Sequence, residues 1–150
     1  MLCEPAEAKE NPLTDIDAKF SLPFVVATAL KHKRVTLDNF FPEALKDKDI
    51  LKLAAKMTYE VDPSLSIKDA TAGFLEITAN NNRVYSKRID HAYGHPGNPI
   101  SQDALVKKFQ DCAGHAANQL PEINLKKAID MIFSLEKVVN IAEVVNCFKP

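Results

Sequence analysis

On either side of Asn80-Asn81-Asn82-Arg83 lie two alternating runs, Phe74-Leu75-Glu76-Ile77-Thr78 and Val84-Tyr85-Ser86-Lys87-Arg88-Ile89. Alternation of apolar and polar side chains is typical of strands with one covered face, and a connection rich in asparagine is typical of a tight turn. The stretch therefore predicts an antiparallel hairpin over residues 73–79 and 83–90.

Helical signals stand before and after this hairpin. Ser21 is a favourable N-cap, Pro23 suits a first helical turn, and apolar residues at positions 22, 25, 26, 29 and 30 share one face. Asp47 is expected to cap a second helix that runs through residue 56, and Ser101 a third that runs to about residue 116. A small antiparallel sheet packed with these helices is an α+β fold.

The remaining stretches are interpreted from their turn formers and apolar blocks. Residues 1–15 contain prolines and little apolar pattern, which indicates a loop or linker, and residues 64–72 are predicted to be a polar connection. Residues 57–61 are predicted to form a strand that stops at Asp62-Pro63, and residues 93–99 to be irregular. Beyond Pro121, apolar blocks over 125–135 and 138–145 predict C-terminal helices with much exposed apolar surface.

Length and charge exclude several kinds of partner. The 150 residues fit one domain with a core of its own, and the 19 Lys and Arg residues nearly balance the 20 Asp and Glu residues. This balance gives no electrostatic field for a polyanion, so we expect no nucleic-acid partner. No apolar run approaches the roughly 20 residues that span a bilayer, and the acidic N-terminus is unlike a secretory signal. We therefore expect no membrane partner and a cytoplasmic location.

The cysteines and histidines do not form a pattern of metal ligands. Cys3, Cys112 and Cys147 are an odd number with wide gaps, which suits neither a disulfide framework nor a zinc cluster. No two of the four histidines are spaced with a carboxylate as in a metal site, and a glycine-rich phosphate loop is missing. We therefore expect no metal and no cofactor.

Two stretches resemble the motifs of one enzyme family. The first is Asp17-Ala18-Lys19-Phe20-Ser21-Leu22-Pro23-Phe24, followed by an Ala-rich helix and Val35-Thr36-Leu37-Asp38-Asn39-Phe40. The second is Tyr93-Gly94-His95-Pro96-Gly97-Asn98-Pro99-Ile100-Ser101, before a helix that supplies Leu105 and Lys108-Phe109. They are similar to the "A-[KR]-F-S-L-P-Y" and "G-H-P-x-N-P-L-S" segments of the MmgE/PrpD family, the 2-methylcitrate dehydratase family. Their order, and the hairpin between them, also match, so the resemblance covers nearly the whole chain.

The resemblance implies a fold and a chemistry. Family members are longer enzymes with a large helical domain and a smaller α+β lid. Residues 1–16 would then be a linker or partial start of the lid, 17–118 the lid-like domain, and 119–150 helices that rejoin the helical domain. The implied reaction is metal-independent proton abstraction next to a carboxylate of a small di- or tricarboxylic acid, as in dehydration of 2-methylcitrate or decarboxylation of cis-aconitate. The catalytic groups of the family lie mainly in the helical domain.

Three residues of the first motif are candidates for substrate binding. Lys19 matches the basic position, and with the Ser21 hydroxyl and free N–H groups at a helix start it could receive a carboxylate. The alternatives are a solvated lysine and a plain N-cap serine. Phe24 stands where many members have a tyrosine, and a phenyl ring cannot donate a hydrogen bond or a proton. The alternative for Phe24 is a core aromatic residue.

His95 is the candidate catalytic residue. It lies between Gly94 and Pro96 in a loop held by conformationally restricted neighbours, and such loops often carry function. The alternative is that its ring binds the backbone and fixes the turn before the next helix.

Two classes of function therefore compete. The first is the C-terminal part of an MmgE/PrpD-type lyase or isomerase, inactive without a helical domain and binding a small carboxylate once completed by one. The second is a non-enzymatic α+β module for dimerisation or binding. A small stand-alone enzyme is disfavoured, because no convincing acid/base pair is present in the sequence. The apolar C-terminal helices lead us to expect a homo-oligomer.

Overall fold

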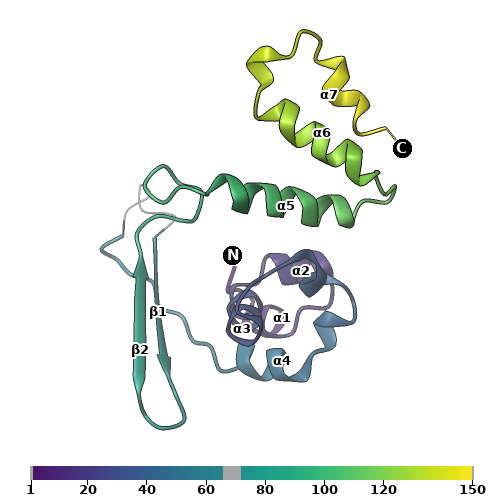
Figure 1. Cartoon of the computed structure of the whole chain (residues 1–150). Helices are drawn as coiled ribbons and strands as arrows, with labels where there is room; N and C mark the ends of the chain where they lie inside the picture. Colours follow the sequence, from purple (N-terminus) through teal and green to yellow (C-terminus); the bar gives the residue numbers. More distant parts are fainter. Residues whose placement is uncertain (1, 66–71, 150) are drawn as a thin grey trace. The chain divides into compact units, whose positions relative to one another are not determined.

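The computed structural model describes residues 2–65 and 72–149. The chain divides into two compact units, Met1–Tyr59 with Lys108–Pro150, and Glu60–Lys107, and each unit is described by itself. Helices and a two-stranded antiparallel sheet follow each other along the described part of the chain (Figure 1). The α+β class predicted from the sequence is confirmed.

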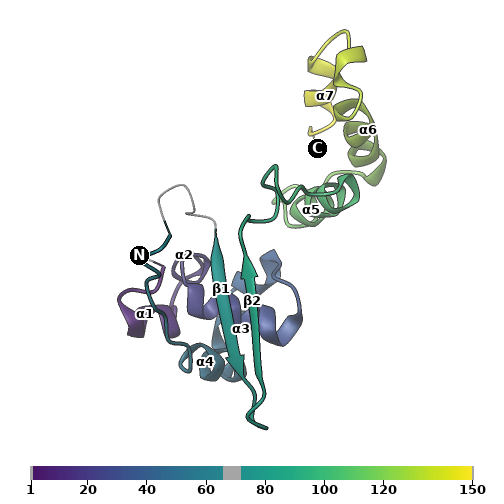
Figure 2. The same cartoon turned by 90° about the vertical axis from the view of Figure 1, so that its left-hand side faces the viewer.

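The first unit is built around α3 (Leu22–His32). The shorter helices α1 (Ala6–Glu10), α2 (Asp15–Lys19) and α4 (Lys48–Ala54) lie around it, as Figures 1 and 2 show. Two 3₁₀ turns, η1 (Leu37–Phe40) and η2 (Ala44–Lys46), connect α3 to α4. Together these elements enclose a core made of Ala18, Phe24, Ala27, Leu45, Ile50 and Ala54.

The predicted helix starts at Ser21 and Asp47 are confirmed. The Ser21 hydroxyl accepts a hydrogen bond from the N–H of Phe24 at 3.0 Å. Oδ1 of Asp47 accepts from the N–H groups of Asp49 at 3.0 Å and Ile50 at 3.3 Å. Each cap satisfies backbone donors that the first helical turn leaves without a partner. The helix after Asp47 ends at Ala54, two residues earlier than predicted.

The loop predicted over residues 1–15 is wrong at residues 6–10 and at residue 15, because α1 and the first residue of α2 lie there. The side chain of Thr14 caps α2 by accepting from the N–H of Asp17 at 3.1 Å. The hydroxyl of Ser21 donates to the carbonyl of Lys9, and the N–H of Leu22 donates to the carbonyl of Leu2 at 2.9 Å. Helices this short have too little periodicity to be seen in the sequence, and these contacts with α3 stabilise them.

The strand predicted over residues 57–61 is also wrong. These residues form no regular structure, and the only partner of β1 within the described residues is β2. Tyr59 and Val61 are exposed, so the alternating side chains cover no core. Alternation alone does not make a strand, because its backbone groups need a neighbouring strand to pair with.

The second unit contains the predicted hairpin. Strands β1 (Gly73–Thr78) and β2 (Val84–Ile89) pair with Gly73 opposite Ile89 and Thr78 opposite Val84. In the connecting turn the N–H of Ala79 donates to the carbonyl of Arg83 at 2.8 Å, and the N–H of Asn82 donates to the carbonyl of Ala79 at 2.9 Å. Asn82 adopts a left-handed conformation with φ of 59°. The hairpin prediction is confirmed. Most of the polar connection predicted over 64–72, namely residues 66–71, lies outside the described residues.

The C-terminal third is helical, as predicted. Ser101 caps α5 (Gln102–Gly114), which passes from the second unit into the first. The helices α6 (Glu122–Ile132) and α7 (Ala142–Asn146) follow, with the 3₁₀ turn η4 (Leu135–Lys137) between them. Their small buried group consists of Ala128, Val144 and Cys147. Several large apolar side chains in this region stay exposed, including Ile123 at 72%, Val139 at 99% and Ile141 at 60%.

Candidate functional site

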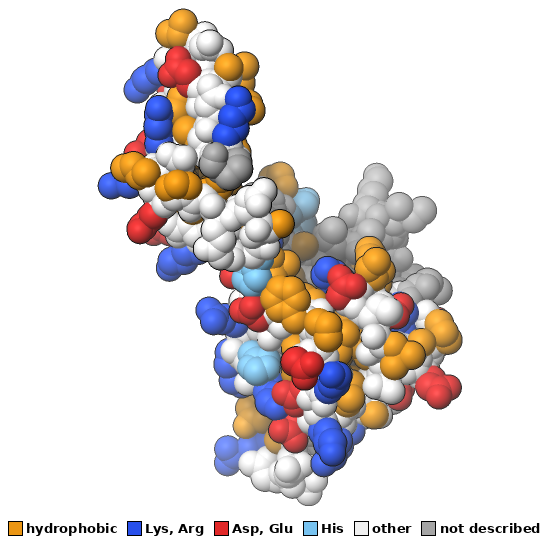
Figure 3. Space-filling model, turned by 90° about the vertical axis from the view of Figure 1, so that its right-hand side faces the viewer, with side chains coloured by type: hydrophobic (Ala, Val, Ile, Leu, Met, Phe, Trp, Pro, Cys, Tyr) orange, Lys and Arg blue, Asp and Glu red, His pale blue; other side chains and the backbone are white. Residues whose placement is uncertain are grey.

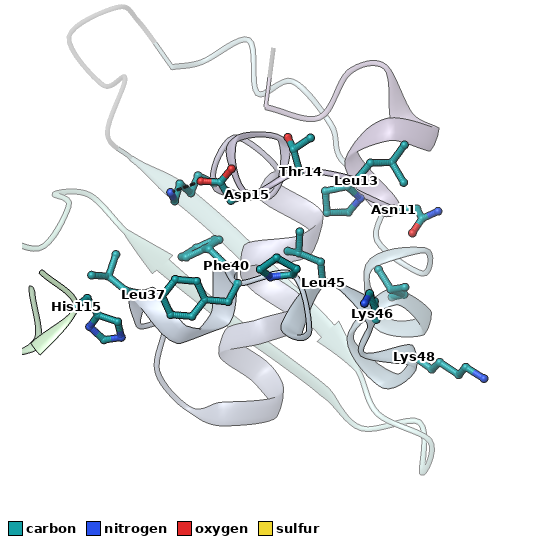
Figure 4. A pocket seen from close by; sticks show the side chains of 15 residues that line it. Asn11, Leu13, Thr14, Asp15, Leu37, Phe40, Leu45, Lys46, Lys48 and His115 are labelled. Atoms are coloured by element: carbon teal, nitrogen blue, oxygen red, sulfur yellow. Dashed lines mark hydrogen bonds and ion pairs between the residues drawn. The ribbon is translucent and has the colours of Figure 1, made fainter. Parts of the chain in front are cut away.

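A groove of about 850 Å³ opens in the first unit (Figure 4). Its floor is apolar, with Leu37, Phe40 and Leu45 contributed by η1 and η2. Lys19, Lys46, Lys48 and His115 are also among the residues that line it. A site of this kind provides cations for an anionic group beside an apolar surface that excludes water.

Lys19, the candidate of the first motif, lies at this groove and is already paired. Its ammonium group donates to Oδ2 of Asp15 at 2.8 Å, and it lies 6.0 Å from the centre of the Phe40 ring. The hydrogen bond from Lys19 holds the pKa of Asp15 below its usual range. An incoming carboxylate would have to compete with Asp15 for the ammonium group.

Ser21 is nearly inaccessible, with 1% of its surface exposed. Its hydroxyl accepts from the N–H of Phe24 and donates to the carbonyl of Lys9. One donor and one acceptor function of the hydroxyl are therefore used within the protein. In this structure Ser21 ties α1 to the start of α3.

Phe24 is completely buried in the core of the first unit. Its ring lies 6.5 Å from that of Phe40, centre to centre, in a tilted arrangement. Phe40 also lines the groove, so Phe24 packs behind the apolar floor of the groove. The structure places this candidate in the core and not among the residues that line the groove.

Sequence reasoning missed the ion pair at the groove between His115 and Asp38. Nε2 of His115 lies 2.8 Å from Oδ1 of Asp38, and Nδ1 lies 2.7 Å from the carbonyl oxygen of Asp111. The hydrogen bond to Asp38, followed by that to the Asp111 carbonyl, raises the pKa of His115. The two partners His115 and Asp38 are 77 residues apart, so no local pattern could reveal the pair. Two acceptors around one imidazole favour its charged form, so both ring nitrogens of His115 are engaged within the protein.

His95 belongs to the second unit and lies, as predicted, in an irregular loop before α5. Its Nδ1 accepts a hydrogen bond from the N–H of Gly97 at 3.0 Å. Its ring stacks on that of His91, with 4.3 Å between the ring centres. The spacing of the two histidines in the sequence gave no signal for this ring contact.

Neither metal-ligand clusters nor membrane-spanning helices are found in the described part of the chain. No three His, Cys, Asp or Glu side chains among residues 2–65 and 72–149 gather around a common point. No helix in the same ranges is long and apolar enough to cross a bilayer. On the face drawn in Figure 3, basic and acidic side chains are interspersed, with apolar side chains exposed between them.

The sequence of the chain matches the MmgE/PrpD C-terminal domain over residues 3–131. The chain belongs to the MmgE/PrpD family. It is also similar to the cis-aconitate decarboxylases of Homo sapiens and Mus musculus, with 22% identity to each over 139 residues. These matches cover 92% of the chain and 28% of each relative, so the chain spans less than a third of their length. The matched range includes residues 3–16 of the segment predicted to be a linker or a partial start of the lid.

Proposed function

We propose that the chain is the C-terminal part of an MmgE/PrpD-type lyase or isomerase for small di- or tricarboxylic acids, inactive without a helical domain. The observation that carries this proposal is the domain match over residues 3–131. The similarity to cis-aconitate decarboxylase, whose substrate is a tricarboxylic acid, supports the substrate class. We also propose a cytoplasmic location, on the composition of the sequence.

The groove supports a role in holding carboxylates. Lys19, Lys46 and Lys48 lie around an apolar floor, and carboxylates are held best by cations at a surface from which water is excluded. Among these, Lys19 is poised to exchange Asp15 for a substrate carboxylate, because the pair is exposed and held by a single hydrogen bond. Exposed ion pairs of this kind contribute only about 0–1 kcal/mol, so the exchange is energetically accessible.

The proposal also explains why the chain alone should be inactive. Removal of a proton next to a carboxylate needs a base held close to the substrate carbon. His115, the histidine at the groove, is engaged through both ring nitrogens. The base would therefore come from a helical domain, supplied by a second polypeptide or by a longer form of the protein.

The test is an assay of the purified chain with 2-methylcitrate, cis-aconitate and related acids, alone and then mixed with the helical domain of a family member. We expect no turnover alone and measurable turnover in the mixture. Lys19→Gln should raise the KM for the acid in the mixture. Lys52→Gln, which removes an exposed lysine outside the groove, should leave the KM unchanged. Robust activity of the chain alone, abolished by His95→Ala, would overturn the proposal and indicate a complete small enzyme.

The second candidate is a non-enzymatic module for dimerisation or binding. It is favoured by the exposed apolar side chains after α5, above all Val139 and Ile141. Large apolar patches rarely stay open in soluble proteins, so this region is expected to cause self-association.

Light scattering across micromolar concentrations tests this candidate. We expect the wild-type chain to self-associate, and Val139→Lys with Ile141→Lys to shift it toward the monomer. Val61→Lys is the matched control, since Val61 is 81% exposed in the other unit. A clean monomer at every concentration would exclude a role in dimerisation.

A further inference from the structure

The loop that follows β2 holds two imidazole rings against each other. The rings of His91 and His95 are stacked, with their centres 4.3 Å apart and their planes 10° from parallel. Nδ1 of His95 accepts from the N–H of Gly97 at 3.0 Å. The ring of His95 is thus held from two directions, by a neighbouring ring and by a backbone donor.

The backbone around His95 is fixed as well. The N–H of Gly94 donates to the carbonyl of Asn98 at 2.8 Å, and the N–H of Asn98 donates to the carbonyl of His95 at 2.7 Å. The side-chain amide of Asn98 donates to the carbonyl of His91 at 3.0 Å, which ties the two ends of the loop together. Gly94 has φ of 99°, a conformation that residues with a side chain rarely adopt. A short loop with this many internal bonds presents its central side chain in one direction.

Gly97 is required by the ring stack and not by its own backbone angles. A Cβ atom at this position would collide with Cδ2 of His91 and would lie 3.0 Å from its Nε2. The absence of a side chain therefore leaves the space that the His91 ring fills. His91, His95 and Gly97 form one packed group, and a change at Gly97 would act on His95 through His91.

The hydrogen bond from Gly97 also selects one tautomer of the neutral His95 ring. Because an N–H group donates to Nδ1, this nitrogen carries the lone pair, and a neutral ring must carry its proton on Nε2. Nε2 lies on the far side of the ring from the bond to Gly97, and the residue is exposed. The loop therefore offers one N–H donor of fixed direction.

We propose that His91 and Gly97 are positioning residues that orient His95, so that its Nε2–H donates a hydrogen bond to a carboxylate oxygen of a small acid. This inference rests on the proposed function for the class of ligand and names the residues that would serve it in the second unit. A donor held in place before the ligand arrives needs no reorganisation during binding, so less side-chain freedom is lost when the ligand binds. His91 acts through ring packing, so another flat ring at this position should replace it.

Nuclear magnetic resonance of the intact chain tests the arrangement without any enzyme assay. We expect a scalar coupling across the hydrogen bond between the Gly97 amide nitrogen and Nδ1 of His95. The coupling should persist in His91→Phe and disappear in His91→Ala and in Gly97→Ala. Unchanged cross-strand contacts between Phe74 and Arg88 would show that the hairpin remains folded in each variant. A proton on Nδ1 of His95, or a coupling that survives in His91→Ala, would overturn the inference.

Titration with citrate, a small tricarboxylate, tests the donor role. The resonances of the His95 ring should shift on addition of citrate in wild type and His91→Phe, and the apparent affinity should fall about tenfold or more in His91→Ala. His32, in the last turn of α3, serves as the internal control for unspecific binding. Equal shifts at His32 and His95, or no shift at His95, would contradict the donor role.

The two proposals fail in different ways. If the reconstituted assembly turns over none of the acids while citrate still shifts His95 selectively, the proposed function fails and the anion site remains. If turnover is observed but is unaffected by His91→Ala and Gly97→Ala, the positioning role fails and the proposed function remains.

Discussion

The ammonium group of Lys31 lies 2.7 Å from Oδ1 of Asp47, the same oxygen that caps α4. It also contacts Oδ2 of Asp47 at 2.8 Å and Oδ2 of Asp49 at 3.0 Å. One carboxylate thus joins the last turn of α3 to the first turn of α4. The hydrogen bond from Lys31 lowers the pKa of Asp47 and, in turn, the hydrogen bond to Asp47 raises the pKa of Lys31.

Replacement of Asp47 should separate its two roles. Asp47→Asn keeps a cap acceptor but loses the charge, whereas Asp47→Ala loses both and should destabilise the chain by about 1 kcal/mol more, the typical contribution of an N-cap. Because the folded-state pKa of Asp47 lies below its unfolded value, its ionic contribution is present above the unfolded pKa and is lost as pH falls through the folded value. Urea unfolding at a series of acidic pH values checks this prediction. If the free energy of unfolding falls as steeply with acid in Asp47→Asn as in wild type, the ionic role of Asp47 is contradicted.

His115 should make stability depend on pH in the opposite direction. The folded-state pKa of His115 is raised, mainly by the hydrogen bond to Asp38. The contribution of His115 to the free energy of unfolding is therefore complete below the unfolded pKa of about 6.5. The contribution is lost as pH rises through the folded value. We expect the denaturation midpoint to fall across that window in wild type and to fall less in His115→Gln and in Asp38→Asn. An identical pH profile in all three proteins would show that the pair contributes nothing to stability.

Phe24 should contribute strongly to the stability of the first unit. Phe24→Ala removes a completely buried ring, and such truncations typically cost about 3–5 kcal/mol. Phe20→Ala is the matched control, because Phe20 is 60% exposed and lies four residues away. Its effect should be smaller by several-fold in thermal or urea unfolding. Equal losses from the two substitutions would contradict the position of Phe24 in the core.

The hairpin turn should depend on the residue at position 82. Asn82 has φ of 59°, which asparagine tolerates and which costs a branched side chain roughly 1–2 kcal/mol. Asn82→Val should therefore speed hydrogen exchange of the amides that close the turn, those of Ala79 and Asn82. Asn80→Val is the control, since no left-handed conformation is found at Asn80. Similar exchange rates in both variants would argue against this turn geometry.

The sequence predicted those elements whose signals are local. The alternation on both sides of Asn80-Asn81-Asn82, and the caps at Ser21 and Asp47, each depend on neighbours within a few residues, and all three appear in the structure. Residues 57–61 had the same alternation as a strand but no neighbouring strand, which a local pattern cannot reveal. The short helix α1 was not predicted, because the contacts with α3 that stabilise it lie outside its own stretch of sequence.

At the candidate site, too, local signals were found and contacts between distant residues were missed. Lys19 was found from its motif and does lie at the groove, but its partner Asp15, four residues away, was not considered. The contact of His115 with Asp38 and the stacking of His91 on His95 depend on how the chain turns back on itself. Sequence spacing therefore located residue types suited to carboxylates but not the partners that determine their charge and direction.

The bond from the Ser21 hydroxyl to the Lys9 carbonyl has a practical consequence for anyone who trims this polypeptide. A fragment designed to start at the first motif, near Asp17, would lose the carbonyl that accepts from this hydroxyl together with α1, which packs on α3. The loss of one hydrogen bond typically costs about 0.5–1.5 kcal/mol, and the packing of α1 on α3 is lost with it. Expression boundaries and fusion tags should therefore be placed upstream of Leu2, whose carbonyl oxygen accepts from the backbone of Leu22.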